Sequence, residues 1–212
     1  MLGGSGSVFP FTFTAEDRYT LLNMNENNLR ERALGGDADA FERLLRPHRE
    51  VMLRLAFRAM GNEEDAREVC QEAVIRIFRY LESFRSGNSF RSWTCRIVLN
   101  CANDVWRQRK RYETMIETQQ KNTSGYSSVN PEKTFLNREI REKIQLCLSG
   151  LSRREKFVFL LRDAEGLSIR ETVDVLGYSS ASVRTHLCRA RKKIRSAMEK
   201  YRLLEGAEGG SG

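Results

Sequence analysis

Apolar residues recur at helical spacing along most of this chain, beginning near residue 37. The clearest run repeats at intervals of 3, 4, 4, 3 and 4 residues and consists of Ala66, Val69, Ala73, Ile77, Tyr80 and Phe84. Such intervals place the side chains on one face of an α-helix. The 212 residues include only three prolines, and one of them, Pro47, should split the helical pattern that precedes this run. The pattern predicts an all-α fold and comes close to excluding an all-β one.

A second helix should follow this run. Asn62 is placed to cap the first helix, and Ser89 is placed to cap the second. The apolar stripe of the second helix consists of Phe90, Trp93, Ile97, Cys101 and Val105. This helix ends in a cluster of basic residues at positions 107–111. Two successive amphipathic helices are therefore expected in the first half of the chain.

The helical periodicity stops at residues 113–129, which are mostly polar. This composition is typical of a solvated connection between domains. Gly and Ser are frequent at both ends of the chain, which we interpret as flexible tails. We therefore expect a tail at residues 1–28, a helical domain at 29–112, a flexible linker at 113–129, a second helical domain at 130–203 and a tail at 204–212.

The second half carries the signals of a helix-turn-helix unit. Two capping boxes, in which a hydroxyl and a carboxylate each satisfy a backbone N–H group, are expected there. They are formed by Ser152 with Glu155 and by Ser168 with Glu171. Gly166 and Gly177 stand where helices must end, and a long helix begins at Ser180. A short helix joined by a brief Gly-containing turn to a basic helix is the helix-turn-helix layout.

The chain is basic, since 36 Lys and Arg residues against 28 Asp and Glu residues give a net charge of +8. The start of the last helix has no acidic residue and contains Arg184, Arg189, Arg191, Lys192, Lys193 and Arg195. A run of basic residues often does no more than keep one face of a helix exposed to solvent. Here, however, the run follows a helix-turn-helix layout, and the second helix of such a unit inserts into the major groove of DNA. We therefore expect it to bind double-stranded DNA, with Arg184, Thr185 and Cys188 or Arg189 nearest the bases.

The first half pairs two helices of opposite charge. Its strong helix begins with Glu63, Glu64, Asp65, Glu68 and Glu72, which also suit a helix N-terminus and need no other role. The next helix is basic and contains Arg91, Arg96, Arg107, Arg109, Lys110 and Arg111. An acidic protein-docking face beside a basic helix is suited to bridging a protein and a nucleic acid. The polar stripe of Asn100, Asp104 and Arg107 is compatible with reading single-stranded bases, although spacing alone does not establish this.

Several classes of protein are disfavoured. No uncharged apolar run approaches the roughly 20 residues that span a bilayer, and the start of the chain lacks the features of a secretory signal. Five cysteines without a C-x-x-C pair indicate reduced thiols that act as small buried hydrophobes. The two histidines do not suggest a metal site, and we find no catalytic residue set. We expect a cytoplasmic protein with no metal, no cofactor and no enzymatic activity.

With these motifs in order, the sequence resembles the extracytoplasmic-function sigma factors of bacterial RNA polymerase. The resemblance runs from about residue 33 to residue 195. Residues 65–72 (DAREVCQE) are similar to the family's clamp-docking helix, and residues 89–97 (SFRSWTCRI) with Asn100 are similar to its promoter-melting helix. The segments 166–168, 176–184 and 189–193 resemble its second-domain helix-turn-helix.

The resemblance implies three sets of binding residues. The set expected to bind the polymerase clamp is Asp65, Glu68, Gln71, Glu72 and Phe78. The set expected at the minus-10 element is Arg91, Trp93, Arg96, Asn100, Asp104 and Arg107. The set expected at the minus-35 element is Ser182, Arg184, Thr185, Cys188, Arg189 and Lys192. The implied partners are bacterial core RNA polymerase, promoter DNA and an anti-sigma factor.

The alternative is a free-standing helix-turn-helix transcriptional regulator. In that interpretation, residues 33–111 form a dimerisation or ligand-sensing domain. The acidic helix at residues 65–72, followed by the basic helix, favours the sigma factor. The alternating Phe9, Phe11 and Phe13 could anchor a partner, but an unstructured leader is the better expectation.

Overall fold

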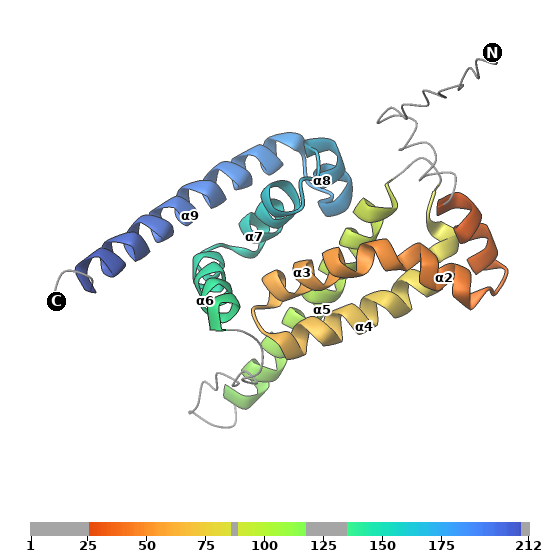
Figure 1. Cartoon of the computed structure of the whole chain (residues 1–212), viewed down its shortest axis with the longest axis horizontal. Helices are drawn as coiled ribbons and strands as arrows, with labels where there is room; N and C mark the ends of the chain where they lie inside the picture. Colours follow the sequence, from red (N-terminus) through yellow and green to blue (C-terminus); the bar gives the residue numbers. More distant parts are fainter. Residues whose placement is uncertain (1–25, 86–88, 118–134, 209–212) are drawn as a thin grey trace, which may run out of the picture. The chain divides into compact units, whose positions relative to one another are not determined.

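The structure is a computed structural model of the chain, and it describes residues 26–85, 89–117 and 135–208. Every regular element in these ranges is helical (Figure 1), which confirms the expected all-α fold. None of the described helices is long and apolar enough to cross a membrane. The chain divides into two compact units, residues 1–47 and residues 48–212. The segment expected to be the linker lies mostly outside the described residues, so the expected domain limits stay a prediction.

The first unit contains a helix over residues 26–34 and the helix α2 (Ala38–Leu45). Asp37 caps α2, because its carboxylate accepts a hydrogen bond from the backbone N–H of Ala40 at 2.9 Å. Arg32 donates to the same carboxylate at 2.6 Å. The backbone hydrogen bond, followed by the Arg32 contact, lowers the pKa of Asp37. Helical structure thus begins before residue 28, inside the segment that we expected to be a tail.

Three helices, α3 (Arg49–Met60), α4 (Glu63–Tyr80) and α5 (Phe90–Glu117), pack against one another (Figure 1). Pro47 lies in the 3-10 turn η1 (Arg46–His48) before α3, where its missing N–H breaks the helical pattern as expected. The buried stripe of α4 consists of Ala66, Val69, Ala73 and Ile77. Buried residues of the other two helices include Leu55 and Ala56 on α3, and Val98 and Ala102 on α5. Alanine at several of these buried positions leaves room for the larger Leu and Ile side chains beside it.

The expected caps of these helices are confirmed, but the end of α4 differs from the prediction. The side chain of Asn62 accepts from the N–H of Asp65 at 2.8 Å, and that of Ser89 accepts from the N–H of Ser92 at 3.2 Å. α4 ends at Tyr80 and continues as the 3-10 turn η2 (Leu81–Ser83). Tyr80 is exposed, because Leu81, which lies four residues after Ile77, continues the buried stripe in its place, and Phe84 remains buried as expected.

The second half contains α6 (Phe135–Ser149), α7 (Arg153–Phe159), the π-helical turn η3 (Leu160–Ala164), α8 (Ile169–Leu176) and α9 (Ser180–Glu208). Both expected capping boxes are present, at the starts of α7 and α8. Gly177 ends α8 with a φ of 68°, in the left-handed region that glycine tolerates best. The core between α7, α8 and α9 is built on Val158, Val183 and Leu187.

Two helices extend beyond their expected limits. α5 continues to Glu117, five residues past the end at position 112 that the polar composition indicated. Residues 113–117 contain neither Gly nor Pro, so nothing in their backbone chemistry stops the helix. α9 likewise continues to Glu208, past the limit at 203. Loss of apolar periodicity therefore does not mark the end of the helix in either case.

Candidate nucleic-acid and protein interfaces

The residues expected at the minus-35 element lie along one face of α9. Arg184, Thr185, Cys188, Arg189 and Lys192 are all exposed. Their spacing of one, three, one and three residues keeps them on one side of a helix. The opposite side is the buried stripe of Val183, Leu187 and Ala190. The sixth residue, Ser182, is half-buried in the first turn, where its N–H donates to Oγ of Ser179 at 3.2 Å.

Two basic residues of α9 form ion pairs with neighbouring elements and do not belong to this exposed face. Arg191 donates to both carboxylate oxygens of Asp163, at 2.7 and 2.8 Å. Lys193 donates to the buried carboxylate of Glu155 at 2.7 Å. Our sequence analysis placed both cations on the DNA-binding helix without separating these roles. A signal was present, because Arg191 lies four residues after Leu187 and therefore flanks the buried stripe.

The pair of Glu155 and Lys193 joins the start of α7 to α9. Burial raises the pKa of the Glu155 carboxyl, but hydrogen bonds from Lys193 and from Ser152 outweigh burial and lower this pKa to about 2. Glu155 is thus ionised at neutral pH while it also completes the capping box with Ser152. One buried carboxylate fixes both a helix start and the register of the basic helix.

Four of the residues expected at the minus-10 element form a row along α5. Arg96, Asn100 and Arg107 are exposed, and Asp104 is half-buried within the same row. Trp93 differs, because its ring packs against Phe84 and Phe90 at centroid distances of 5.3 and 5.5 Å. The body of this indole therefore belongs to an aromatic cluster of the core, and only part of it is accessible to a ligand.

The residues expected at the clamp lie on α4, with one exception. Glu68, Gln71 and Phe78 are exposed, and Glu72 is half-buried. Glu68, Gln71 and Glu72 line a groove between α3, α4 and α5, whose apolar wall includes Leu53 and Ile75. Phe78, which is 58% exposed, lies on the same helix. Exposed apolar side chains beside carboxylates form a surface suited to a protein partner.

Asp65 is the exception, since it is only 1% exposed. Its carboxylate accepts a hydrogen bond from Asn62 at 2.6 Å and another from Arg109 on α5. A carboxylate held in this way cannot reach a partner, so the expected clamp contact of Asp65 is corrected here. Position 65 lies four residues before the buried Val69, on the same face of α4, which is the sequence signal that favours burial there.

Arg76 connects the α4 groove to the row on α5 and was missed by sequence reasoning. Its guanidinium donates to Glu72 at 2.6 Å and to Asp104 at 2.6 Å. The hydrogen bond to Asp104 raises the pKa of Arg76, although burial opposes that shift. Glu72 belongs to the set expected at the clamp, and Asp104 belongs to the set expected at the minus-10 element. Arg76 therefore connects the two expected sites. The four-residue interval between Glu72 and Arg76 is the only sequence signal of this contact.

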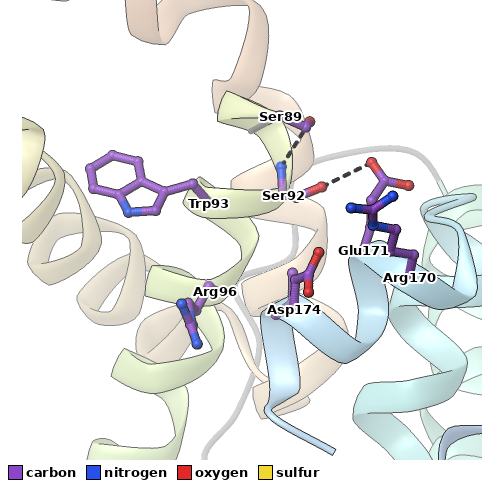
Figure 2. A pocket seen from close by; sticks show the side chains of 8 residues that line it. Ser89, Ser92, Trp93, Arg96, Arg170, Glu171 and Asp174 are labelled. Carbon is purple, nitrogen blue, oxygen red and sulfur yellow. Dashed lines mark hydrogen bonds between the residues drawn. The ribbon is translucent and has the colours of Figure 1, made fainter. Parts of the chain in front are cut away.

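Acidic residues after α7 contact the start of α5. Glu165, which follows η3, approaches Arg54, Arg58 and Arg91 at 3.3, 3.3 and 3.4 Å. Figure 2 shows the neighbouring contact, in which the hydroxyl of Ser92 donates to Glu171 on α8 at 3.1 Å. Arg91 belongs to the set expected at the minus-10 element. Sequence reasoning missed these contacts, because 74 residues separate Arg91 from Glu165.

The cysteines differ in their surroundings. Cys95 and Cys101 are buried as expected, and burial raises their pKa values to about 12 and about 11. Cys188 is exposed, which corrects the expectation that all five thiols are buried. Its position in the exposed row of α9 explains this difference. Among the described residues, no group of His, Cys, Asp and Glu is arranged to hold a metal ion.

Comparison with known families matches both helical regions. Residues 44–112 match the family model for Sigma-70 region 2, and residues 141–194 match the model for Sigma-70, region 4. The first range contains α3, α4 and most of α5. The second range contains most of α6 and the helix-turn-helix. The two matches therefore cover the elements that carry all three expected sites.

Relatives match over most of the chain. The ECF RNA polymerase sigma factor SigE of Mycolicibacterium smegmatis is 30% identical over 76% of this chain, which spans 63% of that protein's length. RNA polymerase sigma-H factor of Pseudomonas aeruginosa is 27% identical over 84% of this chain and 96% of its own length. Among solved structures, CnrH in complex with the cytosolic domain of CnrY has a TM-score of 0.62 and 25% identity, covering 83% of this chain and 98% of that chain.

Proposed function

Because this chain belongs to the extracytoplasmic-function sigma factors of bacterial RNA polymerase, we propose that it binds core polymerase through α4 and reads promoter DNA through α5 and α9. The observation that carries this proposal is the exposed row of Arg184 to Lys192 on α9. In the sequence, this helix follows the two capped helices α7 and α8 and the turn at Gly177. A helix-turn-helix alone would fit many regulators. Its combination with the α4 groove and the polar row on α5 favours a factor that joins polymerase to DNA.

At the minus-35 element, α9 supplies the base contacts. Arg184 lies in the first two turns of the helix, where helix-turn-helix proteins contact base edges, and its guanidinium can donate two hydrogen bonds to a guanine. Lys192 lies two turns further along, where it suits a phosphate. Arg191 and Lys193 hold the helix on α7 and η3, so they set its orientation without touching DNA.

At the minus-10 element, we assign the polar row of α5 to the melted strand. Asn100 presents an amide that can both donate and accept hydrogen bonds, while Arg96 and Arg107 suit phosphates on either side. Asp104, held by Arg76, limits how many anionic groups this face accepts. The chemistry of RNA synthesis belongs to the polymerase, and we infer that this chain contributes binding alone and works in the cytoplasm.

At the polymerase, the groove on α4 is the proposed docking surface. Glu68, Gln71 and Glu72 supply the polar contacts, and Phe78 supplies an apolar anchor beside them. CnrH was solved in complex with the cytosolic domain of CnrY, so a relative of this chain is bound by a second protein. We propose that a separate anti-sigma factor inhibits the present chain by covering the same groove, since one surface cannot hold two partners.

Transcription in vitro tests this proposal. The purified chain is mixed with core polymerase, and the holoenzyme selects its promoter from a pool of random DNA fragments. We expect transcription only when both components are present. The control is Glu68→Ala with Phe78→Ala, which should abolish the stimulation while the helical circular dichroism stays unchanged. Tight occupancy of one DNA site without polymerase, together with no transcription, would establish the free-standing regulator instead.

A further inference from the structure

Three side chains gather beside the turn of the helix-turn-helix, outside the residues assigned above. Tyr178 lies in this turn, between the end of α8 and the start of α9. The guanidinium of Arg154, on the first turn of α7, lies 5.7 Å from the centroid of the Tyr178 ring. The centroid of the His186 ring, on α9, lies 6.1 Å from the same point. Tyr178 therefore brings a residue of α7 and a residue of α9 to one place.

The core of this region fixes the Tyr178 ring. Tyr178 is half-buried and packs against the cluster of Val158, Val183 and Leu187. An aromatic ring attracts a guanidinium above its face, and this contact leaves the N–H groups at the edge of the guanidinium free to donate. Arg154 is exposed to solvent. The ring thus positions an exposed cation without using its hydrogen-bond donors.

Protein groups do not satisfy the two side chains beside this ring. Among the residues that the structure describes, Arg154 forms no ion pair, and Nδ1 of His186 is buried without a hydrogen-bond partner. The carboxylate of Glu155, next to Arg154 in the sequence, accepts a hydrogen bond from Lys193 at 2.7 Å instead. Buried polar groups without a partner are rare in folded proteins. An anion at this place would balance the charge of the guanidinium and supply an acceptor to the imidazole.

This cluster flanks the row of α9 that faces the bases. His186 follows Thr185 directly, so its side chain is turned by about 100° around the helix axis from that of Thr185. Lys193 lies about two turns after His186 on the same side of α9, and it contacts Glu155 of α7. The side of α9 that carries His186 therefore faces α7. When a recognition helix lies in the major groove, its flanks lie beside the phosphate strands that border the groove.

We propose that Arg154, Tyr178 and His186 form a phosphate-binding site for one strand of the duplex beside the minus-35 element. The guanidinium donates charged hydrogen bonds to a phosphate, and the tyrosine hydroxyl and the imidazole add donors. A phosphate contact carries no sequence information, so this site increases the affinity for all sequences and fixes the position of α9 on the duplex. The DNA-binding surface thus extends from α9 to α7. The choice of DNA as the ligand rests on the proposed function above.

The test uses Arg154→Gln in the holoenzyme, because glutamine keeps this exposed position polar but removes the charge. The probe is a fluorescein-labelled duplex of the selected promoter, with binding measured by fluorescence anisotropy. We expect Arg154→Gln to bind about tenfold more weakly, equally for all base sequences, and to reduce the slope of log K against log salt by about 1. His186→Gln should also weaken binding to all sequences. The matched control is Arg153→Gln, which removes a neighbouring charge that lies 5.9 Å from the ring of Trp106 and should bind normally.

A second probe locates the contact on the DNA. Single phosphates around the minus-35 element are replaced, one per duplex, by an uncharged methylphosphonate. At one position the replacement should weaken binding by the parent holoenzyme but not by Arg154→Gln, which has already lost the contact. His186→Gln serves in the same series if Arg154→Gln loses its helical circular dichroism. Identical profiles for the folded variants and the parent, or an equal loss in Arg153→Gln, would overturn this site. Absence of promoter selection and transcription by the parent would instead overturn the proposed function, and this site with it.

Discussion

The cationic side chains of α9 do not all have the same role. Arg184 and Lys192 are exposed, whereas Arg191 and Lys193 are paired with Asp163 and Glu155. The exposed cations are available to DNA, and the paired ones fix the helix on which the exposed ones stand. Loss of an exposed cation should therefore change binding, while loss of a paired one should change stability first.

Arg184→Ala should weaken minus-35 binding by roughly 1 to 3 kcal/mol and relax the preference at one base pair, because a base contact is lost. Lys192→Ala should weaken all sequences equally and reduce the slope of log K against log salt by about 1. Holoenzyme binding to a panel of single base-pair changes, at several salt concentrations, measures both effects. Sequence-independent losses in both variants would place Arg184 on phosphate.

The pair of Glu155 and Lys193 predicts a pH dependence of folding. The pKa of Glu155 is lowered from 4.5 to about 2 in the folded chain, so protonation favours the unfolded chain. The resulting stabilisation is complete above pH 4.5 and is lost as the pH falls toward about 2. Urea unfolding across this range measures the loss. Glu155→Gln keeps a capping side chain and should flatten the profile there, and an unchanged profile would contradict this account.

At the scale of elements, the sequence predicted helix caps and turns, but it did not predict the contacts between helices. Both capping boxes and the Gly177 turn depend on residues three or four positions apart, so the sequence alone located them. The pairs of Arg76 with Asp104 and of Arg91 with Glu165 depend on chain segments that only packing brings together. The same limit applies to the partner of Asp65, because Arg109 lies 44 residues away, although the spacing of Asp65 from the buried stripe of α4 favoured its burial.

Gly177→Ala tests the helix-turn-helix as an element. No atom lies within 4 Å of an added Cβ, so the cost arises from the left-handed backbone at a φ of 68°. We expect a loss of about 1 kcal/mol in the free energy of unfolding, measured in urea. Gly150→Ala adds a Cβ at another open position, without a positive φ, and should cost less. Equal losses in the two variants would exclude backbone strain at Gly177.

The α4 groove gives a second prediction at this scale. Gln71→Ala with Glu72→Ala should weaken core polymerase binding without unfolding the chain, because neither side chain is in the buried stripe of α4. A polymerase pull-down and circular dichroism measure the two effects. Glu63→Ala, which removes an exposed pair with Arg67 on the same helix, is the control and should bind normally. A melted double variant would show that Glu72 and Arg76 support the fold.

At the scale of the whole molecule, a net charge of +8 attracts any DNA, and a genome offers about 10⁶ to 10⁹ non-specific sites. Arg191 and Lys193 of α9 are held by Asp163 and Glu155, and a cation that is held by a carboxylate is not available to neutralise a phosphate. The number of phosphates that α9 can neutralise is therefore smaller than its number of basic residues. Binding to bulk DNA should accordingly depend less steeply on salt than the charge of this helix alone predicts.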